Sequence, residues 1–232
     1  MKKCMLLILC SIGTLCWGQG KFQIGIMYTP EFVGTTYTIQ GPDNSDILGI
    51  VREVSGTSIG FTGGLNLRWN VTDRLSLASG LWFSVKKNTS KKLDIPLQVP
   101  EPNTPEAFRS VLKLSYVDIP LTASYTLGEG KIKPYISVGA IGHIYRGYEQ
   151  YSTQYFENGD VTRVPVPLIG EFPAFTASAM LAGGLDVALG SHANLRIGPS
   201  FKHMFLKASS DNSSVNFFFY SAGLDAEINF SL

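Results

Sequence analysis

The feature that most constrains this chain is an alternation of apolar with small or polar residues, repeated in segments of about ten residues. Near the C-terminus, Leu224, Ala226 and Ile228 alternate with Asp225 and Glu227. Successive side chains of a strand point to opposite faces, so this pattern predicts strands with one apolar and one polar face. After the first twenty residues, the sequence contains no run of 18 apolar residues, so it predicts no membrane-spanning helix.

Eight such segments predict eight strands, and the connections between them alternate in length. The predicted strands cover residues 22–28, 58–69, 74–85, 117–127, 132–145, 175–189, 195–205 and 218–232. Tight turns occur at residues 70–73, 128–130 and 190–194, and longer links at residues 30–57, 87–110, 147–173 and 207–214. This layout predicts an all-β fold, an eight-stranded antiparallel up-and-down transmembrane β-barrel with short periplasmic turns and longer extracellular loops.

The composition of the two faces indicates which one meets lipid. The polar face consists mostly of Gly, Ser, Thr and Ala, which suits a narrow interior better than a solvated surface. Charged residues make up only 16% of the chain, against about 25% in an average soluble domain. A soluble lipocalin-like barrel with the opposite orientation of faces stays an alternative. Aromatic residues near the strand ends predict two interfacial girdles, made of Tyr28, Trp69, Phe83, Tyr125, Phe205, Tyr220 and Phe230.

The first residues have the pattern of a cleaved export signal. Lys2 and Lys3 precede a short apolar run, and small residues follow near Gly18. We therefore predict a signal peptide over residues 1–18 and a single barrel domain over residues 19–232. All three cysteines lie before residue 19, so no disulfide is expected in the exported chain. The formal net charge of +1 gives no reason to expect a nucleic-acid partner.

Charged residues on the polar face predict an ion-pair network inside the barrel, because buried charges must be paired. An eight-stranded barrel is narrow enough for side chains to fill it, which favours a closed interior over a narrow channel. The network is predicted from face parity to contain Arg68, Arg74, Asp118, Asp186, Arg196, Lys202, Asp225 and Glu227.

The loops hold the remaining candidates for binding. Four lysines follow the third predicted strand, Lys86, Lys87, Lys91 and Lys92, and they suit contact with lipid head groups or lipopolysaccharide phosphates. His143 is the one plausible general base, and no nucleophile motif flanks it, so we predict no enzyme activity. No metal-binding or cofactor-binding pattern is present, and no cofactor is expected.

Residues 116–140 resemble a hallmark segment of the PorT-like outer-membrane β-barrel proteins. The match includes Tyr116, the run 118–121 (Asp-Ile-Pro-Leu), the turn glycines Gly128 and Gly130, and the run 133–135 (Lys-Pro-Tyr). The resemblance implies an outer-membrane protein of a Gram-negative bacterium, inserted by the barrel-assembly machinery. It also implies a link with protein secretion, because the founding member is associated with an outer-membrane secretion machine.

These observations predict a structural or interaction role at the cell surface or the periplasmic face. The expected surroundings are outer-membrane lipid and lipopolysaccharide. The alternatives are an accessory component of a protein-secretion machine, a narrow channel and a lipid-modifying enzyme.

Overall fold

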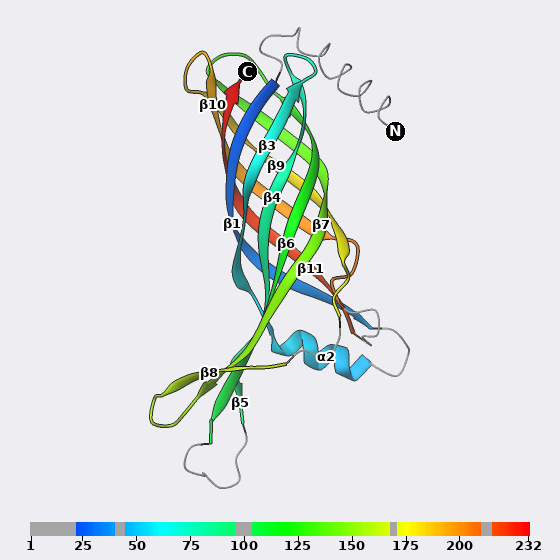
Figure 1. The fold of residues 1–232 in the computed structure, drawn as a ribbon, viewed down its shortest axis with the longest axis vertical. Helices are drawn as coiled ribbons and strands as arrows, with labels where there is room; N and C mark the ends of the chain where they lie inside the picture. Colours follow the sequence, from blue (N-terminus) through cyan, green and yellow to red (C-terminus); the bar gives the residue numbers. More distant parts are fainter. Residues whose placement is uncertain (1–21, 40–44, 96–103, 168–170, 210–214) are drawn as a thin grey trace, which may run out of the picture.

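The computed structural model describes residues 22–39, 45–95, 104–167, 171–209 and 215–232. The predicted signal peptide, residues 1–18, lies outside the described residues. Eight long strands form the body of the molecule (Figure 1). They are β1 (Phe22–Ile39), β3 (Ser58–Asn70), β4 (Leu75–Ser90), β6 (Ala107–Thr126), β7 (Ile132–Tyr155), β9 (Phe175–Ala188), β10 (Ala193–Met204) and β11 (Val215–Ser231). The shorter elements are β2 (Ser55–Gly56), β5 (Leu93–Asp94), β8 (Val161–Pro165) and the helix α2 (Ser45–Val54).

The long strands close into a ring. Each pairs antiparallel with its neighbours along the chain, and β1 pairs with β11 to complete the circle. On β1, for example, Ile26 lies between Leu65 of β3 and Ile228 of β11. Closure satisfies the backbone groups that an open sheet edge would expose, which a structure in lipid requires. The predicted all-β antiparallel barrel is confirmed, although the described chain has eleven strands because β2, β5 and β8 were not predicted.

The two faces of the ring have the predicted orientation. Outward-facing apolar side chains are well exposed, as in Ile26 at 61% and Leu121 at 66%. Inward-facing charged side chains are buried, as in Arg68 at 3%. A soluble barrel has the reverse arrangement, with its apolar face inside. No helix among the described residues is long and apolar enough to cross a membrane.

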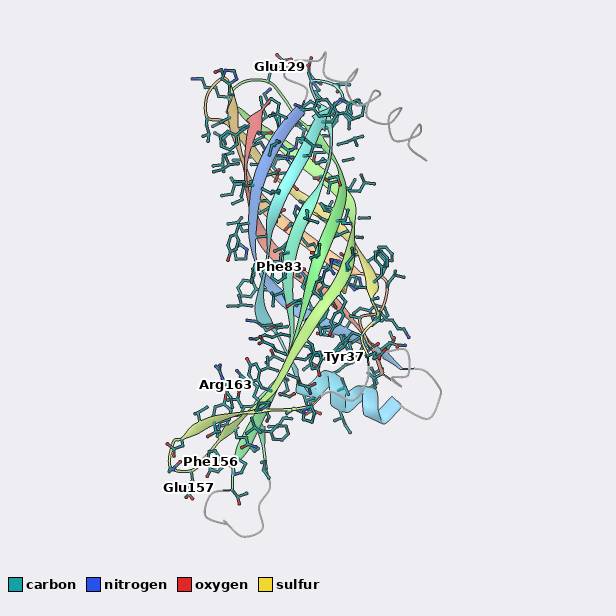
Figure 2. All side chains as sticks on the ribbon, viewed as in Figure 1. Tyr37, Phe83, Glu129, Phe156, Glu157 and Arg163 are labelled. Carbon is teal, nitrogen blue, oxygen red and sulfur yellow. The ribbon has the colours of Figure 1, made fainter. Side chains whose placement is uncertain are left out.

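The two ends of the barrel differ strongly. At one end, which we call the turn end, β1 begins, β11 ends and short turns join the strands; Figure 2 shows Glu129 there. At the other end, the loop end, the strands continue well beyond the barrel (Figure 1). The longest is β7, whose 24 residues span about 80 Å, whereas about ten tilted residues cross a membrane.

We call the part of the sheet beyond the barrel the extension. It consists of β5, β8, residues 107–110 of β6 and residues 151–155 of β7, with β5 pairing with β6 and β8 with β7. It begins where the pairing of β6 with β4 ends, at Val111. The β6–β7 pairing has a register shift between Ser115 and Tyr116, within the ring. The predicted loops at residues 87–110 and 147–173 are therefore largely strands where the structure describes them.

The predicted loop at residues 30–57 is also partly ordered secondary structure. Strand β1 continues to Ile39 instead of ending at Tyr28, and α2 follows at the loop end (Figure 1). The helix is held near β1 by the Arg52 Nη2 atom, which donates to the Tyr37 carbonyl at 3.5 Å.

Candidate functional site

A buried carboxylate lies at the centre of the barrel's polar layer. The two Glu31 oxygens each accept a hydrogen bond from a lysine, Oε2 from Lys86 and Oε1 from Lys202. Oε1 also accepts from the Thr62 hydroxyl at 2.7 Å. All four side chains are at most 4% exposed, and they come from β1, β3, β4 and β10. One carboxylate therefore ties four strands together across the barrel.

A Ser–His–Asp arrangement lies on the neighbouring strands β6, β7 and β9. The His143 Nδ1 atom is 2.7 Å from Asp118 Oδ1, and its Nε2 atom is 2.6 Å from the Ser178 hydroxyl. The Tyr116 ring packs edge-on against the imidazole at 5.6 Å between centroids. All of these side chains are at most 2% exposed. The three residues have the hydrogen-bonding order of a hydrolase triad, but they are sealed inside the wall of the barrel.

A second charged layer lies closer to the turn end. The Arg68 Nη2 atom is 2.7 Å from Glu227 Oε2, and Asn66 Nδ2 donates to Glu227 Oε1 at 2.7 Å. The Asn66 carbonyl oxygen accepts from the Trp82 indole at 2.6 Å. Arg196 stacks on the Tyr135 ring with its guanidinium carbon 3.6 Å from the centroid. Each charge in this layer has a partner, as burial in a narrow interior requires.

Between these layers, Asp225 is held by hydroxyl groups. Its Oδ1 atom accepts from Thr29 at 2.7 Å and from Ser200 at 2.6 Å. An apolar group fills the space beside it, formed by Met27, Trp82, Ile141, Met180 and Ala182.

The loop end of the interior is apolar, which the sequence analysis did not predict. We call this cluster the plug. Its side chains point inward from β1, β6, β10 and β11, with Ala208 just beyond β10, and all are at most 2% exposed. The plug consists of Val33, Leu114, Tyr116, Met204, Ala208 and Phe219. It separates the polar layers from the loop end of the barrel.

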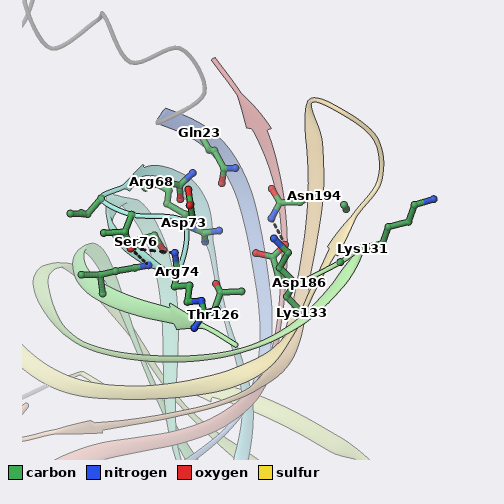
Figure 3. A pocket seen from close by; sticks show the side chains of 16 residues that line it. Gln23, Arg68, Asp73, Arg74, Ser76, Thr126, Lys131, Lys133, Asp186 and Asn194 are labelled. Atoms are coloured by element: carbon green, nitrogen blue, oxygen red, sulfur yellow. Dashed lines mark hydrogen bonds between the residues drawn. The ribbon is translucent and has the colours of Figure 1, made fainter. Parts of the chain in front are cut away.

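The turn end is open instead. A cavity of about 770 Å³, which we call the vestibule, lies between the ends of the strands (Figure 3). Its lining includes Arg68, Arg74, Lys133 and Asp186. The Asp186 Oδ1 atom accepts from Asn194 at 2.6 Å. The vestibule is a mixed-charge recess that narrows toward the Arg68–Glu227 pair.

The structure places most of the predicted interior network inside, in separate groups. Asp118 belongs to the Ser–His–Asp arrangement, Lys202 to the Glu31 cluster and Asp225 to its hydroxyl partners. Asp186 is half-buried at the vestibule, 3.7 Å from the Arg196 Nε atom. Arg74 does not belong to the network, because it lies in a turn and faces the exposed Glu129 at 3.7 Å. The prediction for Arg74 is wrong because β4 begins only at Leu75, so the inward and outward alternation of the strand does not apply to residue 74.

The predicted group of headgroup-binding lysines divides in two. Lys86 is 3% exposed and bound to Glu31, so its prediction as a lipid contact is wrong. The strand β4 runs on to Ser90, and residue 86 falls on its inward face. Lys87 lies on the outward face, and Lys91 and Lys92 follow β4 as exposed residues. The Lys92 ammonium lies 4.7 Å from the centroid of the Tyr155 ring.

Six of the seven predicted girdle aromatics are exposed: Tyr28, Trp69, Phe83, Tyr125, Phe205 and Phe230. Near the turn end, Trp69 stacks on Phe22 at 6.4 Å between centroids. The apolar wall continues past Tyr28 toward the loop end, because Phe32 is 68% exposed. The half-buried Tyr220 has its ring against Gly34 of the neighbouring strand.

Sequence analysis missed Glu31 and Ser178 as functional candidates. Glu31 follows Pro30, and a proline at this position predicts the start of a loop. The alternation 27, 29, 31 of the first strand was the available signal for it. Nothing in the local sequence of Ser178 marks it, because its partners Asp118 and His143 come from other strands. Among the described residues there is no cluster of three or more metal-binding side chains.

Comparison with solved structures finds several bacterial proteins of similar fold. The fold is similar to that of Neisserial surface protein A, with 13% identity over 93% of this chain and 99% of that one and a TM-score of 0.47. It is similar to OprG from Pseudomonas aeruginosa, with 10% identity over 90% and 96% and a TM-score of 0.41. A third similar structure is Ail of Yersinia pestis, with 13% identity over 90% and 99% and a TM-score of 0.31.

No curated protein sequence matches the chain. Residues 22–232, which include the whole ring, match the family described as the outer membrane protein beta-barrel domain. The match and the apolar outer wall indicate a location in the outer membrane of a Gram-negative bacterium. The chain therefore belongs to the outer membrane protein beta-barrel domain family.

Proposed function

We propose that this protein is a non-conducting outer-membrane barrel that holds an interaction surface, the extension, outside the cell. The observation that carries the proposal is the long β6–β7 ladder, which runs from the barrel wall to Ala107 and Tyr155 with one register shift. In this proposal the turn end faces the periplasm and the loop end faces outward, as is usual for outer-membrane barrels.

The finer features of the sequence analysis fit the same proposal. The ring acts as an eight-stranded transmembrane barrel, exported through a signal peptide at residues 1–18 and inserted by the barrel-assembly machinery. The PorT-like resemblance of residues 116–140 covers the end of β6 and the beginning of β7, the two strands that carry the extension.

The interior supports a closed barrel over a channel. An eight-stranded ring leaves room for little more than side chains. Here the plug fills the loop end, and the Glu31 cluster fills the layer below it. An ion entering from the vestibule meets the Arg68–Glu227 pair and then these layers.

We also propose that the Ser–His–Asp arrangement is structural and not catalytic. Ser178 is 2% exposed, and no cavity described above contains it. The strand backbone around it is paired on both sides, with Ser178 opposite Ile141 and Met204, so no pair of free amides forms an oxyanion hole. Its hydrogen bonds instead join three strands.

A role as an accessory of a protein-secretion machine is the second candidate. The vestibule favours it, because it offers an open recess of about 770 Å³ to periplasmic partners. Arg74 and Lys133 at this recess suit contact with an acidic segment.

Site-specific photo-crosslinking in intact cells tests these two roles. Probes would replace Arg163 on the extension, Asp73 at the vestibule, and Leu224 on the lipid-facing wall as a control. A specific protein adduct at position 163 supports the proposal, whereas an adduct at position 73 alone supports the secretion role. Adducts at neither position, or equally at position 224, contradict both. Conductance of the purified full chain in planar bilayers would contradict the closed interior.

A further inference from the structure

Two lysines face each other on the outer wall where the apolar belt ends. Lys87 of β4 lies directly opposite Lys113 of β6 in the antiparallel pairing. Phe83 and Val117 form a pair four residues closer to the barrel centre and belong to the apolar wall. Like charges at directly opposed positions of neighbouring strands destabilise a sheet. An anion at the same level would offset this repulsion.

The protein supplies part of that compensation from the next strand. Glu149 of β7 lies opposite Lys113, and its Oε2 atom is 2.7 Å from the Lys113 ammonium. This hydrogen bond lowers the pKa of Glu149 and keeps it anionic. Lys87 forms no ion pair within the described residues. The carboxylate thus pairs with Lys113 alone and not with the opposed Lys87.

The same face carries more positive charge farther from the barrel. In the pairing of the extension, Arg109 of β6 and Arg163 of β8 lie on either side of Thr153 of β7. Arg109 precedes Lys113 by four residues, or about 13 Å along the strand.

A tyrosine lies between these two levels. The Tyr151 ring has the Lys113 ammonium at 5.5 Å and the Arg163 guanidinium at 5.3 Å from its centroid. We call this face the basic wall, and it consists of Lys87, Arg109, Lys113, Tyr151 and Arg163.

The basic wall is a direct continuation of the lipid-facing surface. On β6, residue 113 has the same outward parity as Val117 and Ile119, whereas Leu114, Tyr116 and Asp118 point inward and are buried. A cation on this face, just beyond the belt, lies at the depth of the phosphate groups of the outer leaflet. Tyrosine is enriched at that depth because its ring is apolar and its hydroxyl is polar.

We propose that the basic wall binds the phosphate groups of an outer-leaflet lipid head group, with Lys87 and Lys113 as the primary contacts. The phosphate inserts between the two opposed ammonium groups and competes with Glu149 for Lys113. Arg109, Arg163 and Tyr151 contact the more distal part of the head group. The outer-leaflet position rests on the orientation proposed above, and Arg109, Tyr151 and Arg163 also belong to the extension. Lipid binding to the purified chain is measured without a protein partner, so the two proposals are tested separately.

Binding of lipid A to the full chain in phosphatidylcholine nanodiscs, followed by native mass spectrometry, tests the proposal. The lipid A probes carry two, one or no phosphate groups. Lys87→Ala and Lys113→Ala should each weaken binding of the phosphorylated probes roughly fivefold. Glu149→Gln should strengthen it, because the competing carboxylate is removed. Lys131→Ala, an equal charge change at the turn end, should leave it unchanged.

Three results would overturn the proposal: equal binding of phosphorylated and unphosphorylated lipid A, unchanged binding by both lysine variants, or weaker binding by Glu149→Gln. Inorganic phosphate is a separate arm, because displacement of the lipid by free phosphate would indicate a site for a soluble anion. Heat-modifiable gel mobility verifies that each variant is folded, and Lys87→Arg with Lys113→Arg should retain binding if either alanine variant fails this check.

Discussion

At the scale of single residues, the stability of the interior depends on one carboxylate that neutralises two buried lysines. Glu31 binds both Lys86 and Lys202, and all three are almost fully buried. Removing one member of a buried ionic group destabilises a protein far more than replacing the whole group by apolar residues, because the remaining partners stay buried without a counter-charge. Glu31 is therefore the residue whose loss the barrel should tolerate least.

We expect Glu31→Gln to destabilise the assembled barrel by about 3–5 kcal/mol, because two lysines lose their counter-ion. Urea titration of the folded, fast-migrating form on unheated gels measures this change. Glu129→Gln is the matched control, since its carboxylate is exposed and 3.7 Å from Arg74. Equal midpoints for the two variants would refute the role given to Glu31.

Leu224→Arg tests the outward face. Leu224 is 50% exposed on the wall, and arginine at a lipid-facing position costs about 2–4 kcal/mol near the bilayer midplane. The yield of heat-modifiable protein in membranes should fall, whereas Leu224→Ala should retain it. The inward Gly223 is unsuitable as a tolerant control, because an added Cβ atom would lie 2.6 Å from the Pro30 carbonyl oxygen. Full assembly of Leu224→Arg would contradict the outward orientation.

Residue parity was predictable from the sequence wherever the alternation was unbroken. Arg68, Lys202 and Glu227 were placed inside correctly because small residues surround them on the polar face. Lys86 and Glu31 were not, since a run of lysines and a proline both resemble loop beginnings. The pairing of His143 with Ser178 depends on register between strands, which local patterns do not encode.

At the scale of elements, the extension is the largest departure from the sequence prediction. Residues 147–155 contain five polar residues and three tyrosines but no apolar alternation. A sheet that meets water on both faces needs no apolar face, so its strands lack the usual period-2 signal. Only the ladder with β6 and β8 reveals them as strands.

The β7–β8 turn should be the site where external protease first cuts intact cells. It contains Gly159 with a φ of +86°, and residues 157–160 are exposed at the tip, where Figure 2 labels Glu157. Exposed loop tips are preferred cleavage sites. Treatment with a glutamate-specific protease followed by mass spectrometry should give cleavage after Glu157 with a still heat-modifiable barrel. Protection of this bond in intact cells, with cleavage after lysis, would place the extension inside.

At the scale of the whole molecule, the interior is polarised along its axis. The turn end opens into the vestibule, the middle holds paired charges, and the loop end is filled by the plug. Sequence analysis predicted the closed polar interior but not the plug, because its residues lie in segments that were assigned to loops or to strand ends. The ring itself followed from the repeat of alternating segments and short turns.

Single cysteines report this polarity in a chain whose natural cysteines, Cys4, Cys10 and Cys16, are replaced. Ser76→Cys, which lines the vestibule, should react with a membrane-impermeant maleimide after the periplasm is opened. Val33→Cys in the plug should stay unlabelled from both sides, because the residue is 0% exposed. Labelling of Val33→Cys from outside would show that the loop end admits water.

The long ladder of β6 and β7 also has a mechanical consequence. A partner that pulls on the tip loads this ladder along the strand axes, so many backbone hydrogen bonds resist the force in parallel and do not open one at a time. The register shift beside Tyr116 is the place where the β6–β7 ladder deforms most easily, and Tyr116 belongs to the plug. Tension on the tip is thereby delivered to the plug.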